Sequence, residues 1–255
     1  MNNITHADPR IGGRNFGDFF VQRDAMVLLL TWAAGGVDAI SYLGLGHVFT
    51  ANMTGNAVLL GLAVGQGQGL AALRSIIALA GFVLGVSMGA MLMGQRPSPG
   101  EWSRAASRAV ALEWIILALF TLTWHLAGRA RAGEPLYPLI ALSAVAMGIQ
   151  SAAIRHLRVP GIATTYITGT LTSMVSGFVG WLQAKIVPSS TDNFTQPRTP
   201  SAEQKHGPRL QAAVLGIYIL AAVASGFLQA RGSRLVALSP PVALTLVLAN
   251  TFFRR

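Results

Sequence analysis

The chain has 255 residues, of which 52% are hydrophobic and only 11% are charged, and its formal net charge is +10. Soluble domains typically carry about 25% charged residues, so this composition excludes a protein whose surface mostly faces water. The absence of cysteine excludes disulfides, thiolate metal sites and cysteine nucleophiles. The basic residues are spread over the loops between apolar runs, without a basic helix or patch, so we expect no nucleic-acid partner.

Residues 1–24 form a polar lead-in without the features of a cleavable signal peptide. Beyond them, several apolar runs reach the length of about 20 residues that a bilayer crossing requires. We predict an all-α polytopic membrane protein whose partner is the lipid bilayer. The predicted spans are Ala25–Leu45, Ala71–Gly94, Ala109–Leu126, Leu136–Ile154, Leu210–Ala230 and Leu235–Phe253.

Two further apolar segments, Thr54–Val64 and Thr168–Val187, leave the topology open. If they dip into the membrane and return, six helices cross; if they span it, eight helices cross. Lys and Arg mark the cytoplasmic side of short loops. Six crossings and two re-entrant or broken helices gather more of these residues on the side of the N-terminus, so we favour this arrangement, with both termini cytoplasmic.

A repeated motif divides the chain into two membrane repeats, at residues 25–127 and 136–255. The stretch "TANMTGN" (Thr50 to Asn56) is similar to "TTYITGT" (Thr164 to Thr170), and each follows a span that contains a glycine and then a polar residue, Asp38 or Gln150. Three crossings in each half make the repeats inverted, whereas eight spanning helices make them parallel. In the second repeat, residues 188–208 are rich in proline and polar residues and predict a flexible loop.

The two motifs predict a solute site because irregular backbone inside a membrane survives only against protein or a water-filled cavity. A helix that begins near Thr54 or Thr168 would direct its positive dipole end inward, which suits an anionic or dipolar solute. Alternatively, these threonines cap two ordinary helices at the interface. The predicted substrate-binding residues are Asp38, Asn52, Thr54, Gly55, Asn56, Gln150, Thr168, Gly169 and Thr170.

Asp38 is the strongest candidate for a functional residue because it lies about 20 Å into the first span, where an ionisable group is costly unless it is paired or faces water. It could carry a proton, bind a coupling cation, or hold the broken region together by hydrogen bonds. Glu113 is a weaker candidate: it lies one turn beyond Arg108, near the start of its span, where it could snorkel or pair.

The stretch "GGVDAISYLGLGHVFTANMTGNAVLLG" (Gly35 to Gly61) resembles the signature of the YoaK-like family of bacterial multi-pass membrane proteins, whose function is unknown. Gly-Gly, Asp-Ala, Ser/Thr-Tyr-Leu and Phe-x-x-Asn-x-Thr-Gly-Asn follow one another in that order. The resemblance implies a protein of a bacterial inner membrane and singles out Asp38, Asn52, Thr54, Gly55 and Asn56. It implies no substrate.

We therefore expect a transporter or channel-like protein for a small polar solute, without a cofactor or metal site, and coupled to protons or cations through Asp38. The alternative is a membrane scaffold or sensor. An intramembrane enzyme is less favoured, because paired intramembrane aspartates, a Gly-x-Ser-x-Gly element and a His-Glu-x-x-His helix are missing from the sequence. Gly81, Gly85 and Gly89 form a close-packing ridge, which predicts an internal helix contact or, alternatively, a homo-oligomer.

Overall fold

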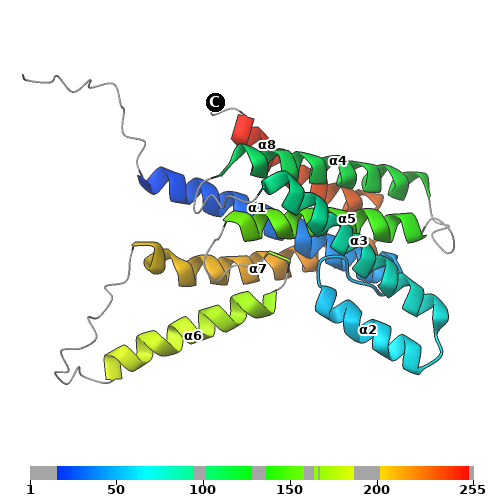
Figure 1. Cartoon of the computed structure of the whole chain (residues 1–255), viewed down its shortest axis with the longest axis horizontal. Helices are drawn as coiled ribbons and strands as arrows, with labels where there is room; N and C mark the ends of the chain where they lie inside the picture. The colour runs from blue at the N-terminus through cyan, green and yellow to red at the C-terminus, as the bar shows by residue number, and fades with distance from the viewer. Residues whose placement is uncertain are drawn as a thin grey trace, which may run out of the picture.

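The computed structural model describes the backbone of residues 16–94, 102–127, 136–157, 164–165, 167–186 and 202–252, and every regular element in these ranges is helical. Figure 1 shows the elements in chain order. They are α1 Phe16–Gly44, α2 Met53–Gly65, α3 Gly69–Met93, α4 Arg104–Leu126, α5 Leu136–Leu157, α6 Ile167–Ile186, α7 Ala202–Ala230, the 3-10 helix η1 Arg234–Leu238 and α8 Ser239–Phe252.

Six of the helices match the six predicted spans in length and hydropathy. Within the described ranges, these candidate spans are Arg23–Gly44, Gly69–Met93, Arg104–Leu126, Leu136–Leu157, Gly207–Ala230 and Arg234–Thr251. Helix α2 has 13 residues and is only about 20 Å long, which is shorter than the hydrocarbon core of about 30 Å. The fold is therefore the predicted all-α polytopic membrane protein, with α2 and α6 outside the set of spans.

Two helices begin earlier than we expect from the sequence. Helix α1 already begins at Phe16, inside the predicted lead-in, and runs into the first span without a break. Helix α7 begins at Ala202 and contains Pro208, so the last residues of the predicted flexible loop are helical. The rest of that loop lies outside the described residues.

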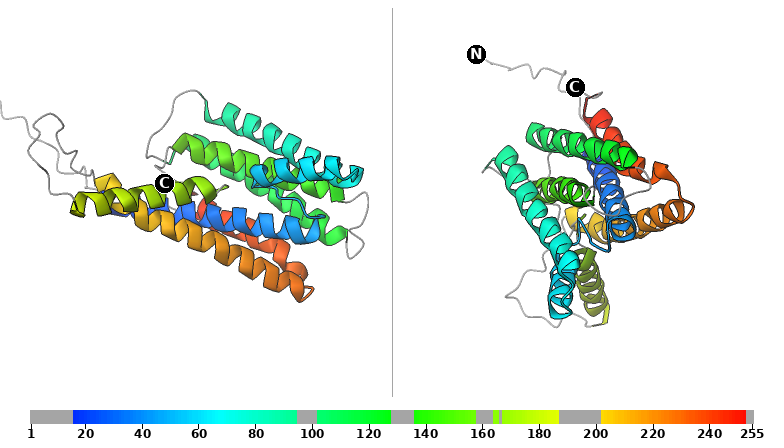
Figure 2. Two further views of the ribbon diagram at one scale, coloured as in Figure 1. Left: turned by 90° about the horizontal axis from the view of Figure 1, so that it is seen from below. Right: turned by 90° about the vertical axis from the view of Figure 1, so that its right-hand side faces the viewer.

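The two halves of the chain run in opposite directions. In Figure 1, α1 runs from the left end of the bundle to the right end, and α5 runs from right to left. Helix α2 starts near the middle and runs out toward the right end, where α3 begins, whereas α6 starts near the middle and runs out toward the left end, where α7 begins. The left panel of Figure 2 shows the same opposite directions of α2 and α6. Each half thus consists of one long helix, one helix that starts midway, and two further long helices.

The two halves repeat the same helix packing if α1, α2, α3 and α4 are taken to correspond to α5, α6, α7 and α8. Helix α1 packs on α7 as α5 packs on α3; α2 packs on α3 as α6 packs on α7; and α4 packs on α5 as α8 packs on α1. Opposite chain directions with equivalent packing partners are what an inverted repeat requires. The contacts thus support a repeat, and the opposite directions of the helices favour the inverted arrangement over the parallel alternative.

Glycines allow the closest of these helix contacts. A Cβ atom added to Gly148 of α5 would lie 2.3 Å from the carbonyl oxygen of Phe82 on α3. Gly35 of α1 makes a similarly close contact with α7, because an added Cβ would lie 2.6 Å from the carbonyl oxygen of Tyr218. The glycine ridge of α3 is buried against α5 of the same chain, which is the predicted internal contact; it comprises Gly81, Gly85 and Gly89. A homo-oligomer would need another face.

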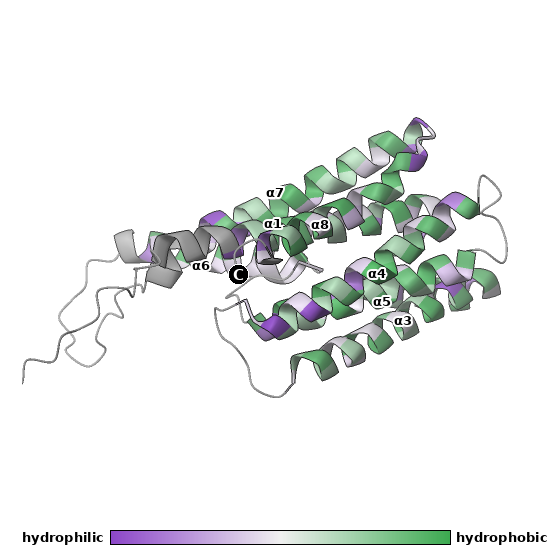
Figure 3. Cartoon of the chain, turned by 90° about the horizontal axis from the view of Figure 1, so that it is seen from above, coloured by the Kyte–Doolittle hydropathy of each residue, from purple (hydrophilic) through white to green (hydrophobic). Residues whose placement is uncertain are grey.

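The surface along the helices is apolar. Large hydrophobic side chains are exposed on α2, α3, α6 and α7, for example Val58, Val83, Phe178 and Val223. Figure 3 shows hydrophobic colouring along the lengths of the helices and hydrophilic colouring mainly toward helix ends. A lipid environment satisfies such a surface, whereas water would not.

Candidate functional site

The chain folds back after α1 and returns along it to start α2. Asp38, which lies about 9 Å before the end of α1 by helical rise, receives this returning segment. Its Oδ1 atom accepts hydrogen bonds from the backbone N–H groups of Thr50 at 2.9 Å, Ala51 at 2.7 Å and Asn52 at 3.4 Å. The non-helical backbone thus has the acceptor that it needs where no water is available.

The second carboxylate oxygen of Asp38 connects the two halves of the chain. Tyr218 of α7 donates its hydroxyl hydrogen to Oδ2 at 2.5 Å. Asp38 itself is 3% exposed, and close by the hydroxyls of Ser41 and Thr50 are hydrogen-bonded at 2.8 Å. We call Asp38, the backbone of residues 50–52 and Tyr218 the Asp38 junction. Its four donors make the carboxylate a structural acceptor; a role in carrying a proton or cation stays a prediction.

Two asparagines fix the start of α2. Asn56, which is fully buried, accepts from the backbone N–H of Phe49 at 2.9 Å through Oδ1 and donates to the carbonyl of the same residue through Nδ2. Asn52 is the N-cap, and its Oδ1 accepts from the N–H of Gly55 at 3.3 Å. The alternative that Thr54 caps this helix is therefore wrong, because α2 begins at Met53 and Asn52 supplies the capping oxygen.

The second half has a corresponding junction around Gln150. Its Nε2 donates to the hydroxyl of Thr164 at 3.0 Å and to the backbone carbonyl of Leu30 on α1 at 3.0 Å. Thr164 corresponds to Thr50 in the repeated motif, so in each half the buried polar residue of the long helix binds the equivalent threonine. We call Gln150, Thr164 and the Leu30 carbonyl the Gln150 junction. The predicted correspondence of the two motifs is thus also a correspondence of contacts.

The remaining predicted site residues lie in the first turns of α2 and α6. Thr54 and Thr168 are exposed, and neither hydroxyl forms a hydrogen bond with any part of the chain that the structure describes. Gly55 and Gly169 are half-buried, and Thr170 is buried. A Cβ on Gly55 would lie 2.8 Å from the ring of Phe49, which explains a glycine at this position.

The structure adds Tyr218, which the sequence analysis missed, and changes the interpretation of Glu113. Tyr218 lies 180 residues from Asp38, and neither repeated motif includes it. Glu113 is fully buried and has no hydrogen-bond partner among the described residues, while Arg108 is exposed. The expectation that Glu113 snorkels or pairs near a helix end is therefore wrong, because its side chain points into the packed interior.

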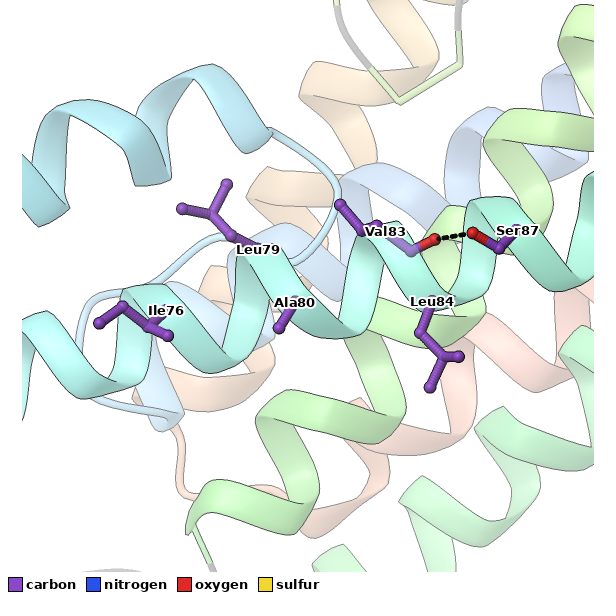
Figure 4. A pocket seen from close by; sticks show the side chains of 6 residues that line it. All are labelled: Ile76, Leu79, Ala80, Val83, Leu84 and Ser87. Atoms are coloured by element: carbon purple, nitrogen blue, oxygen red, sulfur yellow. Dashed lines mark hydrogen bonds between the residues drawn. The ribbon is translucent and has the colours of Figure 1, made fainter.

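The shallow pocket of about 550 Å³ on the outer face of α3 does not resemble a polar site. All the side chains in Figure 4 come from this helix: Ile76, Leu79, Ala80, Val83, Leu84 and Ser87. Its only hydroxyl, that of Ser87, donates to the backbone carbonyl of Val83 at 2.9 Å. The pocket suits a lipid chain better than a polar solute, and it includes none of the residues of either junction.

Comparisons with known proteins agree with this architecture. Residues 26–251 match the family described as "Protein of unknown function (DUF1275)". The chain is 43% identical over 161 residues to "UPF0700 transmembrane protein YoaK" of Bacillus subtilis (strain 168), over 63% of this chain and 69% of the relative. No solved structure matches. The family match covers all six candidate spans except residues 23–25 at the start of the first one, and the chain belongs to this DUF1275 family of membrane proteins.

Proposed function

We propose that the protein transports a small polar solute across the membrane, without chemically converting it, through a site between the N-terminal ends of α2 and α6. The observation that supports this most strongly is the opposite orientation of these two helices, each of which starts near the middle of the bundle (Figure 1). Transporters with inverted repeats bind their substrates near the membrane midplane, at the ends of such broken helices.

The free groups at the helix starts define the kind of solute. The backbone N–H groups of Met53 and Thr54 are orphan donors of the first turn of α2, and no acceptor for them lies within the described part of the chain. The hydroxyls of Thr54 and Thr168 add two further groups without a partner in the described ranges. Helix N-termini carry positive partial charge, so this set favours an anion or the negative end of a dipolar solute.

The two junctions would provide the rigid support for this site. The Asp38 junction holds the segment before α2, and the Gln150 junction holds Thr164, which precedes α6. The bias of basic residues supports cytoplasmic termini in the cell membrane. A protein that only binds a partner at its surface would not need two buried junctions that bring helix ends toward the middle of the bundle.

Ligand-induced stabilisation of the purified protein tests this proposal. In detergent, the thermal stability would be measured with phosphate, sulfate, nitrate, neutral amino acids and carboxylic acids, since a ligand at 100 times its Kd stabilises by about 2.7 kcal/mol. A stabilising solute, supplied in radiolabelled form, should then enter proteoliposomes that contain the protein. Failure of every solute to stabilise the protein, or binding without flux, would contradict transport of these solutes.

Two threonine variants locate the binding site. Thr54→Val and Thr168→Val each remove one hydroxyl, and we expect about three- to tenfold weaker solute binding, which corresponds to one hydrogen bond. Thr123→Val is the matched control, because the exposed Thr123 hydroxyl of α4 donates to its own helix, to the carbonyl of Leu119. Equal affinity in all three variants would place the solute elsewhere.

A further inference from the structure

Glu113 is a carboxyl group inside the helix bundle that neither junction uses. It lies about 14 Å along α4 by helical rise from Arg104 and is 0% exposed. Val110 and Leu117, one turn before and after it, belong to the apolar cluster that joins α4 to α1, α5 and α8. Its helix neighbours thus surround it with hydrocarbon.

Neither oxygen atom of Glu113 has a hydrogen-bond partner among the described residues, and no basic side chain within those residues forms an ion pair with it. Helix α1, which shares the apolar cluster, carries Arg23, Asp24, Asp38 and Tyr42 among its described side chains; Arg23 lies 3.6 Å from Asp24, and Asp38 is bound in its own junction. The elements packed on α4 carry further titratable groups: Arg74 on α3, Tyr137, Arg155 and His156 on α5, and Arg234 on η1. Helix α8 carries none. Arg74 instead donates to the carbonyl of Gly46, and Arg155 and Arg234 are exposed. On α4 itself, Arg104 and Arg108 are exposed, and His125 contacts the carbonyl of Thr121.

An unpaired carboxylate in such surroundings is far more costly than the neutral acid. The neutral acid leaves only ordinary polar atoms unsatisfied, at about 1–3 kcal/mol, whereas the buried charge needs a partner or water. A leucine would avoid both costs, so packing gives no reason for a glutamate here. Intramembrane carboxyl groups of this kind mark ion or proton pathways.

We propose that Glu113 is a proton-binding site: it holds a proton while the packed helices bury its carboxyl group, and it releases the proton in an arrangement that admits water. If the proposed transport function is correct, on which this second step rests, the exchange couples proton movement to solute movement. Asp38 is less suited to this task, because adding a proton would compete with the four donors already bound to its carboxylate. Within this proposal, the coupling proton is therefore bound by Glu113 and not by Asp38.

Carbodiimide labelling tests the proton site without any solute. Dicyclohexylcarbodiimide is apolar and reacts with a protonated carboxyl group: the acid proton moves to a carbodiimide nitrogen, the carboxyl oxygen bonds to the central carbon, and the adduct rearranges to a stable acylurea. The purified wild-type protein would be labelled in detergent over a range of pH values, and the modified peptide identified by mass spectrometry. We expect the adduct at Glu113 and not at Asp38, with a decrease of about tenfold per pH unit above the midpoint.

The variant Glu113→Gln provides an independent check, because it should remove the infrared carbonyl band of a protonated carboxylic acid from the spectrum. The wild-type peptide analysis stays decisive if this variant folds poorly. Absence of an adduct at Glu113, when the unfolded protein is labelled there, would overturn the proposal. So would labelling that does not change with pH throughout the range in which the protein stays folded.

Solute addition separates this inference from the proposed function. If a solute identified by stabilisation changes the labelling of Glu113 in the wild type, and Thr54→Val weakens that change, proton and solute sites are coupled. Labelling that titrates in a protein for which no solute is found would sustain the proton site and contradict the transport proposal. Solute flux with a silent Glu113 would contradict only the proton site.

Discussion

Replacing Asp38 should reveal how much of the stability depends on its junction. Asp38→Ala leaves four donors without an acceptor: the N–H groups of Thr50, Ala51 and Asn52 and the hydroxyl of Tyr218. At about 1–3 kcal/mol for each buried group, the loss is at least about 4 kcal/mol. Since domains are stable by only about 5–15 kcal/mol, we expect little folded protein at moderate temperature.

Asp38→Asn should be milder, because the amide oxygen can still accept the three backbone hydrogen bonds. Bonds to a charged acceptor are worth about 1 kcal/mol more than bonds to a neutral one, so three weakened bonds cost about 3 kcal/mol. The Tyr218 hydroxyl can turn and accept from the new amide group. The expected order of stability is therefore wild type, Asp38→Asn and Asp38→Ala.

The measurement is the fraction of protein that stays monodisperse in size-exclusion chromatography after heating in detergent. Thr31→Val is the matched control on the same helix, since the buried Thr31 hydroxyl bonds only to the carbonyl of Val27 in its own helix. It should cost no more than about 1.5 kcal/mol. If Asp38→Ala is as stable as this control, the junction does not hold the returning segment, and the reasoning is refuted.

Two more changes test the start of α2 and the contact between α3 and α5 in the same heating assay. Asn56→Ala removes both hydrogen-bond partners of the Phe49 backbone and should lower the free energy of unfolding by about 2–6 kcal/mol. The control Thr54→Ala changes an exposed side chain and should stay within about 0.5 kcal/mol of wild type. Similar losses of stability in the two variants would contradict the role of Asn56. Gly148→Ala should cost at least about 1–3 kcal/mol because its Cβ would meet the α3 backbone. The control Gly177→Ala lies on α6 with open space around the added methyl group and should raise the free energy of unfolding by about 0.5–1 kcal/mol. If Gly148→Ala is as stable as wild type, the close contact between α3 and α5 is contradicted.

The sequence predicts the six candidate spans and the two further apolar segments, now α2 and α6, well, because hydropathy and length directly reflect the bilayer. One of the three roles that the sequence leaves open for Asp38, holding the broken region together by hydrogen bonds, agrees with its contacts to residues 50–52. A depth of about 20 Å makes an aspartate costly, and irregular backbone nearby needs an acceptor. Both arguments depend on properties of single segments.

The parts that the sequence could not predict depend on contacts between distant segments. Tyr218 joins Asp38 across 180 residues, and tyrosines are common in membrane helices, so the sequence carries no signal for this pair. The short distance along the helix from Arg108 to Glu113 suggested an ion pair. Only the packing shows that Glu113 is buried while Arg108 is exposed. The N-cap was misplaced by two residues, because asparagine and threonine are both good capping residues.

The central claim is that the chain forms two inverted repeats. In each repeat, the segment that contains α2 or α6 enters the membrane and returns to the side from which it came. Cysteine-free protein allows a direct test with single cysteines at Gln68, Arg104 and Ser233, labelled in intact cells with a membrane-impermeant maleimide. In Figure 1 the α2–α3 turn and the α7–η1 turn lie at one end of the bundle, and α4 begins at the other. The account predicts that Gln68→Cys and Ser233→Cys are both labelled in intact cells, whereas Arg104→Cys is labelled only after the membrane is permeabilised. Labelling of Gln68→Cys and Ser233→Cys from opposite sides would mean eight crossings, and would contradict both the inverted repeat and the site built on it.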